Sequence, residues 1–244
     1  KSSVESSTYS VRKRILEKIC ETFSSLTLRN ISMEHVQDFR IWLLNDVESN
    51  GSGYSQSYAG LVFGVFRKSL DYAVELGYLE YNISLKAKAI PKAKAITPYW
   101  TKNEFESVIS QIYIVDFYEH LNFVMLWIYF MTGVRVNEGT ALWWNDIDFK
   151  NKKMRIHHML VLKNRDEWVR NTYTKTTDGK RTIALDEDTI GILKNWREQQ
   201  KTIGLGEEQD FIFTYDGLPM IKSTLSRIIK RYASLAGVKS IQGK

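Results

Sequence analysis

The strongest constraint on the fold is an apolar run that ends at a glycine and leads directly to an arginine and a glutamate. Residues 121–131 (LNFVMLWIYFM) contain one polar residue, and the run is too short to cross a membrane but long enough for a buried helix. Gly133 suits the end of that helix, because a residue without a Cβ enters the left-handed conformation cheaply. We expect the next helix to begin near Val134 and to carry Arg135 and Glu138, three residues apart, on one face.

This arrangement is suited to holding a phosphate group. The planar guanidinium of Arg135 offers a fork of donors that matches two phosphate oxygens, and Glu138 can orient it. An arginine and a glutamate at helical spacing more commonly form an exposed ion pair, so the pair alone does not indicate a phosphate site.

The longer string around the pair resembles the first catalytic box of the tyrosine recombinases, the phage-integrase family. That box reads roughly T-G-x-R-x-x-E-x-x-x-L-x-W-x-D-I-D, and residues 132–149 read TGVRVNEGTALWWNDIDF. Arg135 matches the family's first catalytic arginine, and Glu138 matches its partner acid. The match continues at Leu142, Trp144, Asp146, Ile147 and Asp148.

Composition narrows the classes of protein to which the chain can belong. A net charge of +6 over 244 residues favours a polyanionic partner. The single cysteine, Cys20, excludes an internal disulfide framework and a multi-cysteine zinc site, and its helical surroundings predict a buried thiol. We find no signal peptide, membrane span or lipidation signal, so we expect a cytoplasmic protein of a bacterial host. Because it begins with Lys1, we expect the chain to be part of a longer protein.

Residues 1–85 form the first predicted domain, a bundle of helices with short connections. Apolar spacing predicts helices over about 9–23, 32–44 and 55–75, and Gly77 marks the end of the third. This half resembles the family's core-binding domain, which grips one face of DNA. A helical module for some other partner would show the same pattern.

Residues 86–98 form a predicted basic linker, with lysines at Lys86, Lys88, Lys92 and Lys94 and no acidic residue. Lysines neutralise phosphates without reading sequence, so a linker that crosses DNA adds affinity. The alternative is a solvated linker whose charge only keeps it extended.

Residues 99–244 form the second predicted domain. Thr101 and Glu104 match a capping box. Strands are expected at 147–149, 153–162, 167–174, 181–185 and 211–214, and further helices at 188–201 and 222–236. The predicted fold class is therefore α+β: an all-α core-binding bundle, followed by a mixed α/β domain with a small antiparallel sheet, which the resemblance identifies as a recombinase catalytic domain.

A second string, residues 174–185 (TKTTDGKRTIAL), also resembles the family. Asp178 and Gly179 form a tight-turn dipeptide, which places Lys175 close to a hairpin tip. The resemblance implies that Lys175 is the family's hairpin lysine, a general acid to the leaving oxygen. Lys180 is the competing candidate, and Lys180 and Arg181 are candidate DNA contacts. Ordinary solvent-facing charges beside a turn are the alternative.

The resemblance implies that a tyrosine attacks a phosphodiester and gives a 3′-phosphotyrosine link and a free 5′-hydroxyl. No metal or cofactor is required, because two arginines and a His or Lys neutralise the phosphate. None of the thirteen tyrosines matches the nucleophile position, and the chain stops before the family's second box, His-x-x-Arg. Lys244 stands where that box has its His or Lys. We therefore expect residues 1–244 to bind DNA but not to cleave it.

The expected function is site-specific recombination for a phage or an integrative mobile element, and a chromosome-dimer resolvase would use the same chemistry. The partners implied by the family are double-stranded core-site DNA, a homotetramer on that DNA, and accessory bending or directionality factors. The alternative is a non-catalytic DNA-binding protein derived from this fold. His157 and His158 fall on a strand, so we expect their rings on opposite faces and no shared metal ion.

Overall fold

A computed structural model describes residues 6–93, 97–164, 166–172 and 179–241, with side chains from residue 8 onward. The chain divides into two compact units, unit 1 at 1–96 and unit 2 at 97–244, and each is described by itself. Within the described residues, every helix is either too short or too polar to span a membrane.

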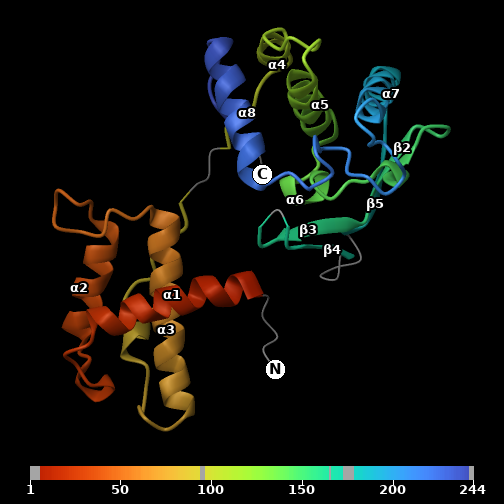
Figure 1. Ribbon diagram of the computed structural model, residues 1–244. Coiled ribbons are helices and arrows are strands. Elements are labelled where there is room, and N and C mark those ends of the chain that lie inside the picture. Colours follow the sequence, from red (N-terminus) through yellow and green to blue (C-terminus); the bar gives the residue numbers. More distant parts are fainter. Residues whose placement is uncertain (1–5, 94–96, 165, 173–178, 242–244) are drawn as a thin grey trace. The chain divides into compact units, whose positions relative to one another are not determined.

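Unit 1 is built from three helices, as the apolar spacing predicts (Figure 1). Their bounds are α1 (Ser6–Thr22), α2 (Met33–Leu44) and α3 (Gln56–Glu75), with 3-10 helices at Leu28–Asn30 and Ile83–Lys86. The side chain of Ser32 caps α2 and that of Ser55 caps α3, each accepting a backbone N–H from the first turn. The predicted stop after α3 is confirmed, because Gly77 has a φ of +75°.

The core of unit 1 is rich in phenylalanine. The Phe23 ring stacks on Phe66 at 5.1 Å between centroids and meets the edge of Phe39 at 5.2 Å. Helix α1 adds Ile15 and Ile19, which are four residues apart and therefore share a face.

The prediction that Cys20 is buried is wrong, because its side chain is exposed. Ile19 is the residue of α1 that faces the core at this level. The next residue along a helix points about 100° away, which turns Cys20 toward solvent.

Part of the predicted linker packs on unit 1. Ala87 and Ile90 are buried in the same core. The guanidinium of Arg67 donates to the carbonyl of Ala87 at 2.9 Å, and that of Arg40 donates to the carbonyl of Lys88 at 2.8 Å. These contacts fix the backbone as far as Ile90, while the lysine side chains of this segment face solvent.

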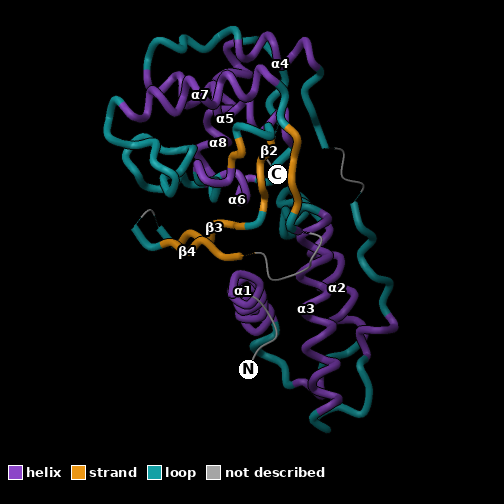
Figure 2. Tube along the Cα trace, turned by 90° about the vertical axis from the view of Figure 1, so that its right-hand side faces the viewer, coloured by secondary structure: helices purple, strands orange, loops and turns teal. Residues whose placement is uncertain are grey.

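Unit 2 places its long helices on one side and a two-stranded β-ribbon on the other, with the short helix α6 between them (Figures 1 and 2). The helices are α4 (Lys102–Ile109), α5 (Phe117–Thr132), α6 (Val136–Gly139), α7 (Glu187–Lys201) and α8 (Lys222–Leu235). The predicted capping box of α4 is confirmed.

Two buried tryptophans in the core of unit 2 form hydrogen bonds between segments that are distant in the sequence. The indole N–H of Trp144 donates to Gln200 at 2.8 Å, and that of Trp196 donates to the carbonyl of Ile212 at 2.7 Å. The predicted strand at 211–214 is wrong: the segment forms only an isolated bridge between Phe211 and Trp143. The carbonyls of Ile212 and Thr214 instead accept hydrogen bonds from the buried side chains of Trp196 and Gln200 on α7.

The described strands form two small antiparallel sheets. Strands β1 (Ile147–Asp148), β2 (Lys153–Ile156) and β5 (Arg181–Ala184) pair in the order β1-β2-β5. Strands β3 (His158–Leu162) and β4 (Trp168–Thr172) form the β-ribbon.

The predicted single strand at 153–162 is therefore wrong, because it is interrupted at His157. Ile156 is paired with Arg181 in one sheet and His158 with Thr172 in the other, so the two ladders meet at His157. The turn of the β3–β4 hairpin falls at 163–167. Lys175, expected near a hairpin tip, lies outside the described residues, so its position stays a prediction.

Candidate phosphate-binding site

The backbone before α6 positions the first site residue. Asp116 caps α5, with its carboxylate accepting from the backbone N–H groups of Tyr118 and Glu119 at 2.9 Å each. The helix ends at Gly133, whose φ of +61° confirms the predicted left-handed turn. Arg135 is then the N-cap of α6 rather than a residue within it, so the next helix begins two residues later than expected.

Glu138 is the centre of the site and is only 1% exposed. Its carboxylate accepts from the Arg135 backbone N–H at 3.0 Å and from the Arg135 guanidinium at 2.8 Å. The guanidinium of Arg181, on β5, donates to both oxygens of the same carboxylate, at 2.7 and 3.2 Å. One buried acid thus orients two arginines from separate elements.

The two arginines differ in their exposure. The Arg135 side chain is 66% exposed, whereas that of Arg181 is 33% exposed. Arg135 can therefore present its guanidinium to a ligand while Glu138 holds it in place. The expected contact between Arg135 and Glu138 is present. Arg181 is predicted from the sequence only as a DNA contact, and its contact with Glu138 becomes evident only in the structure.

Tyr129 forms a hydrogen bond to the short helix α6. Its hydroxyl donates to the carbonyl of Val136 at 3.0 Å. Burial and the negative charge of Glu138 both raise the pKa of this phenol above its ordinary value. A Cβ at Gly139 would lie 2.4 Å from the Tyr129 hydroxyl oxygen, so only glycine lets the two elements approach this closely. Tyr129 is thus a structural group near the site and not an activated nucleophile.

Asp146, a further residue of the same box, anchors the β-ribbon. Its carboxylate accepts from the Trp143 backbone N–H at 3.0 Å and from the Arg170 guanidinium. Arg170, on β4, also donates to the Ala141 carbonyl at 2.8 Å, and its guanidinium lies 3.9 Å from the centroid of the Trp143 ring. The contact between Arg170 and Asp146 could not be predicted from the sequence, because the two residues are 24 positions apart and no pattern within β4 points to it.

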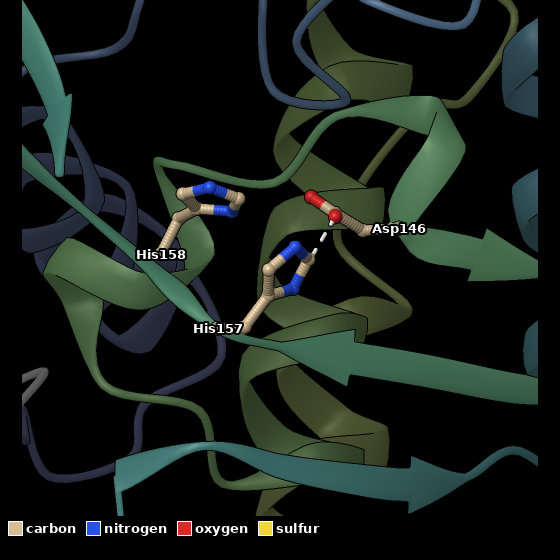
Figure 3. Close-up of side chains that lie close together, drawn as sticks. All are labelled: Asp146, His157 and His158. Atoms are coloured by element: carbon tan, nitrogen blue, oxygen red, sulfur yellow. Dashed lines mark ion pairs between the residues drawn. The ribbon is translucent and has the colours of Figure 1, made fainter. Parts of the chain in front are cut away.

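The prediction that His157 and His158 point to opposite faces is wrong. Their ring centroids are 4.0 Å apart, and His157 Nδ1 lies 3.6 Å from Asp146 Oδ1 (Figure 3). The alternation of a strand does not apply, because β2 ends at Ile156 and β3 begins at His158. Burial, followed by the charge of Arg170, lowers the pKa of His158 to about 4, so this ring is neutral at pH 7.

The remaining predicted site residues are lysines, and the structure describes four of them. Lys86, Lys88 and Lys92 are exposed on unit 1, and Lys180 is exposed on unit 2. Lys94, Lys175 and Lys244 lie outside the described residues. The proposed roles of all these lysines stay predictions.

Comparison with known proteins decides the family. The model described as the phage integrase family matches residues 100–243, and that of the phage integrase SAM-like domain matches residues 1–89. The chain belongs to the phage integrase family. This membership confirms the family resemblance that was identified from residues 132–149 and 174–185.

Curated relatives of this phage integrase family member come from mobile elements. The ICEBs1 integrase of Bacillus subtilis (strain 168) is 26% identical over 239 residues, covering 92% of this chain and 60% of the relative. The prophage ps2 probable integrase of Lactococcus lactis subsp. lactis (strain IL1403) is also 26% identical, covering 95% and 61%. The chain thus spans about three fifths of the length of these relatives.

Solved structures share the fold. The Tn1549 transposon integrase in complex with transposon right end DNA matches with a TM-score of 0.75 at 20% identity, over 96% of this chain and 75% of that one. A lambda integrase dimer bound to a COC' core site matches with a TM-score of 0.69 at 14% identity, over 99% and 76%. The predicted α+β fold class is confirmed.

Proposed function

We propose that the whole protein to which this chain belongs is a site-specific DNA recombinase of a phage or an integrative mobile element. It cuts and rejoins double-stranded DNA through a 3′-phosphotyrosine intermediate, and this chain supplies the core-site-binding part and a portion of the catalytic site. The observation that carries the proposal is the buried carboxylate of Glu138, which orients two arginines at one place.

The charges of these three side chains suit a phosphodiester. Two guanidinium groups and one carboxylate leave one positive charge, and a phosphodiester carries one negative charge. The pentacoordinate transition state carries more negative charge than the substrate, so donors fixed in advance stabilise it more strongly than the ground state. Arg135 is the more exposed of the two arginines and is the group proposed to touch the phosphate.

The other roles follow from the family. Glu138 and Arg181 position Arg135, since both act through the carboxylate contact. Lys175 is proposed as the general acid to the 5′-oxygen, with Lys180 as the competing candidate, and Lys244 as the residue in place of the second-box His or Lys. The nucleophilic tyrosine is assigned to the whole protein, because none of the thirteen tyrosines here matches its position.

The proposed partners are core recombination sites in DNA and further copies of the protein. Solved relatives are described as a dimer on a core site and as a tetramer on a Holliday junction, which supports a homotetramer on DNA. The exposed lysines Lys86, Lys88 and Lys92, together with Lys94, are proposed to contact phosphates without sequence preference. We also propose accessory factors that bend the DNA or set the direction of recombination. Because the proposed substrate is DNA of a bacterial host, the proposed location of the activity is the cytoplasm.

The substitution Arg135→Lys in the whole recombinase tests this function. A lysine keeps the charge but loses the planar fork, so we expect covalent cleavage of a nicked core-site substrate to slow by about 100-fold or more. Core-site binding should stay within a few-fold of wild type. The measurement is the rate of formation of a detergent-resistant protein–DNA adduct.

The control is Arg227→Lys, since Arg227 is exposed and its guanidinium donates to Thr224 at 3.2 Å rather than to Glu138. Cleavage by this variant should match wild type. If Arg135→Lys cleaves within a few-fold of wild type, Arg135 does not hold the phosphate.

A second candidate is a non-catalytic DNA-binding protein derived from the fold, in which Arg135 and Lys175 would contact phosphates only. An adduct formed by the whole protein would exclude it. The polypeptide of residues 1–244 alone is expected to bind core-site DNA without forming an adduct. An adduct from that polypeptide would overturn the assignment of the nucleophile to the whole protein.

A further inference from the structure

We infer that Asp146, His157 and His158 form a binding site for a late first-row transition-metal ion such as Zn²⁺. Each residue offers one ligand atom, and these atoms all lie within 4.8 Å of one another (Figure 3). The site lies where β2 ends and β3 begins, and it does not depend on the proposed recombination activity.

Unsatisfied buried nitrogens point to a missing ligand. The Nδ1 atoms of His157 and His158 are both buried, and within the described part of the chain neither has a hydrogen-bond partner. Leaving a buried polar atom unpaired costs about 1–3 kcal/mol, and two such atoms side by side are uncommon in a folded protein. An ion that accepts the imidazole lone pairs would satisfy both residues.

The separation of the ligand atoms is close to what an ion needs. Ligand atoms at 2.0–2.1 Å from a tetrahedral Zn²⁺ are about 3.3 Å apart. Because 4.8 Å is the upper limit of the present separations, each group has to move inward by at most about 1 Å, which a side-chain rotation supplies. A fourth position stays open for water, as in zinc sites with three protein ligands.

Asp146 is already oriented for this role. The backbone N–H of Trp143 and the guanidinium of Arg170 both bond to Oδ2, which leaves Oδ1 directed at His157. Such outer hydrogen bonds hold a ligating carboxylate in place. The positive charge of Arg170 opposes a dication on the same carboxylate, so we expect micromolar rather than nanomolar affinity.

The chemistry of the ligands selects the class of metal. Two imidazoles and one carboxylate suit zinc, cobalt, nickel or copper, whereas magnesium and calcium prefer oxygen ligands alone. A bound ion would link the 3-10 helix Trp144–Asp146, which carries Asp146, to the start of the β-ribbon at His158. It would therefore stabilise the attachment of the ribbon at the point where the register is interrupted.

Metal titration of tag-free, chelator-treated protein tests the inference. We expect Zn²⁺ to bind at one ion per chain with micromolar affinity by calorimetry, and to raise the melting temperature of unit 2 by mass action. Co²⁺ should give the visible absorption of a four-coordinate site, and a hundredfold excess of Mg²⁺ should not displace it. Wild-type protein that binds neither Zn²⁺ nor Co²⁺ would overturn the proposal.

Substitution of the histidines locates the site. His157→Gln and His158→Gln should each weaken Zn²⁺ binding at least tenfold, because glutamine supplies no imidazole nitrogen. The matched control is His35→Gln, since His35 lies in the first turn of α2 in unit 1, and its substitution should leave Zn²⁺ affinity unchanged. Far-ultraviolet circular dichroism of each metal-free variant confirms that it is folded. Folded glutamine variants that bind Zn²⁺ as tightly as wild type would place the ion elsewhere and refute this site.

Discussion

Glu138 illustrates how a single buried charge organises the phosphate-binding site. A carboxylate that is 1% exposed has lost most of its hydration, which costs several kcal/mol unless close partners compensate. Arg135 compensates through its backbone and guanidinium, and Arg181 compensates through two further hydrogen bonds. These hydrogen bonds offset the cost of burying the carboxylate, and they also restrict the positions of both guanidinium groups. The same contacts therefore stabilise unit 2 and preorganise the arginines of the site.

At the residue scale, we expect the substitution Glu138→Gln to lower the stability of unit 2. The amide keeps the shape but offers one acceptor oxygen and turns an N–H₂ group toward the guanidinium groups, so we expect a loss of about 1–3 kcal/mol in the free energy of unfolding. Urea denaturation measures it.

The matched control for that loss is Glu198→Gln. Glu198 pairs with Lys201 at 2.7 Å on the surface of α7 with both side chains exposed, where an ion pair contributes at most about 1 kcal/mol. Equal effects of the two substitutions would show that Glu138 does not hold the arginines by charge.

At the scale of elements, the turn after α5 decides where Arg135 is placed. Gly133 has a φ of +61°, and a Cβ added there would meet nothing within 4 Å. The need for glycine is therefore a matter of backbone conformation and not of space. Any residue that resisted this conformation would shift the start of α6 and, with it, Arg135 and Glu138.

Two glycine substitutions separate conformation from space. Gly133→Ala should destabilise unit 2 by about 1–2 kcal/mol, because an L-residue resists the left-handed region. Gly191→Ala should instead stabilise it by up to about 1 kcal/mol. Gly191 lies inside α7 without a positive φ, and an added Cβ there also meets nothing within 4 Å. Thermal unfolding of both variants provides the measurement, and a Gly133→Ala protein at least as stable as Gly191→Ala would contradict the argument.

The strands show where element-level prediction failed. Alternation over 153–162 predicted one strand, but hydrogen bonding divides it between two sheets at His157. The pairing partners change between Ile156 and His158, and no local pattern over 153–162 reveals that change. The same break brings the two histidines together.

At the scale of the whole molecule, the two units have separate hydrophobic cores. The core of unit 1 centres on phenylalanines such as Phe66, and that of unit 2 on residues such as Trp196 and Leu193. Stability is then a property of each unit, because cavity costs act on the core that contains the cavity.

A core substitution in unit 1 should act on that unit alone. Phe66→Ala removes a fully buried ring and should cost unit 1 about 3–5 kcal/mol. Hydrogen-exchange mass spectrometry should show faster exchange in α2 and α3, with α5 and α7 unchanged.

The reciprocal control is Leu193→Ala in α7, which should speed exchange in unit 2 only, at a cost of about 2–5 kcal/mol. Faster exchange in α5 caused by Phe66→Ala would mean that the two cores unfold together.

The sequence by itself determined the features that depend on neighbours along the chain. Helix caps at Ser32 and Thr101, the left-handed turn at Gly133 and the contact of Arg135 with Glu138 all involve residues within a few positions of one another. Their energies are local, so spacing and residue type suffice to predict them.

Only the tertiary structure decided which distant residues share a site. Arg181 reaches Glu138 across 43 positions and Arg170 reaches Asp146 across 24, and both contacts depend on how the strands are paired. The exposure of Cys20 depends on which face of α1 meets the core, and the proximity of His157 to His158 depends on the break between β2 and β3. These outcomes are set by packing between segments, and a pattern within one segment carries no information about the other.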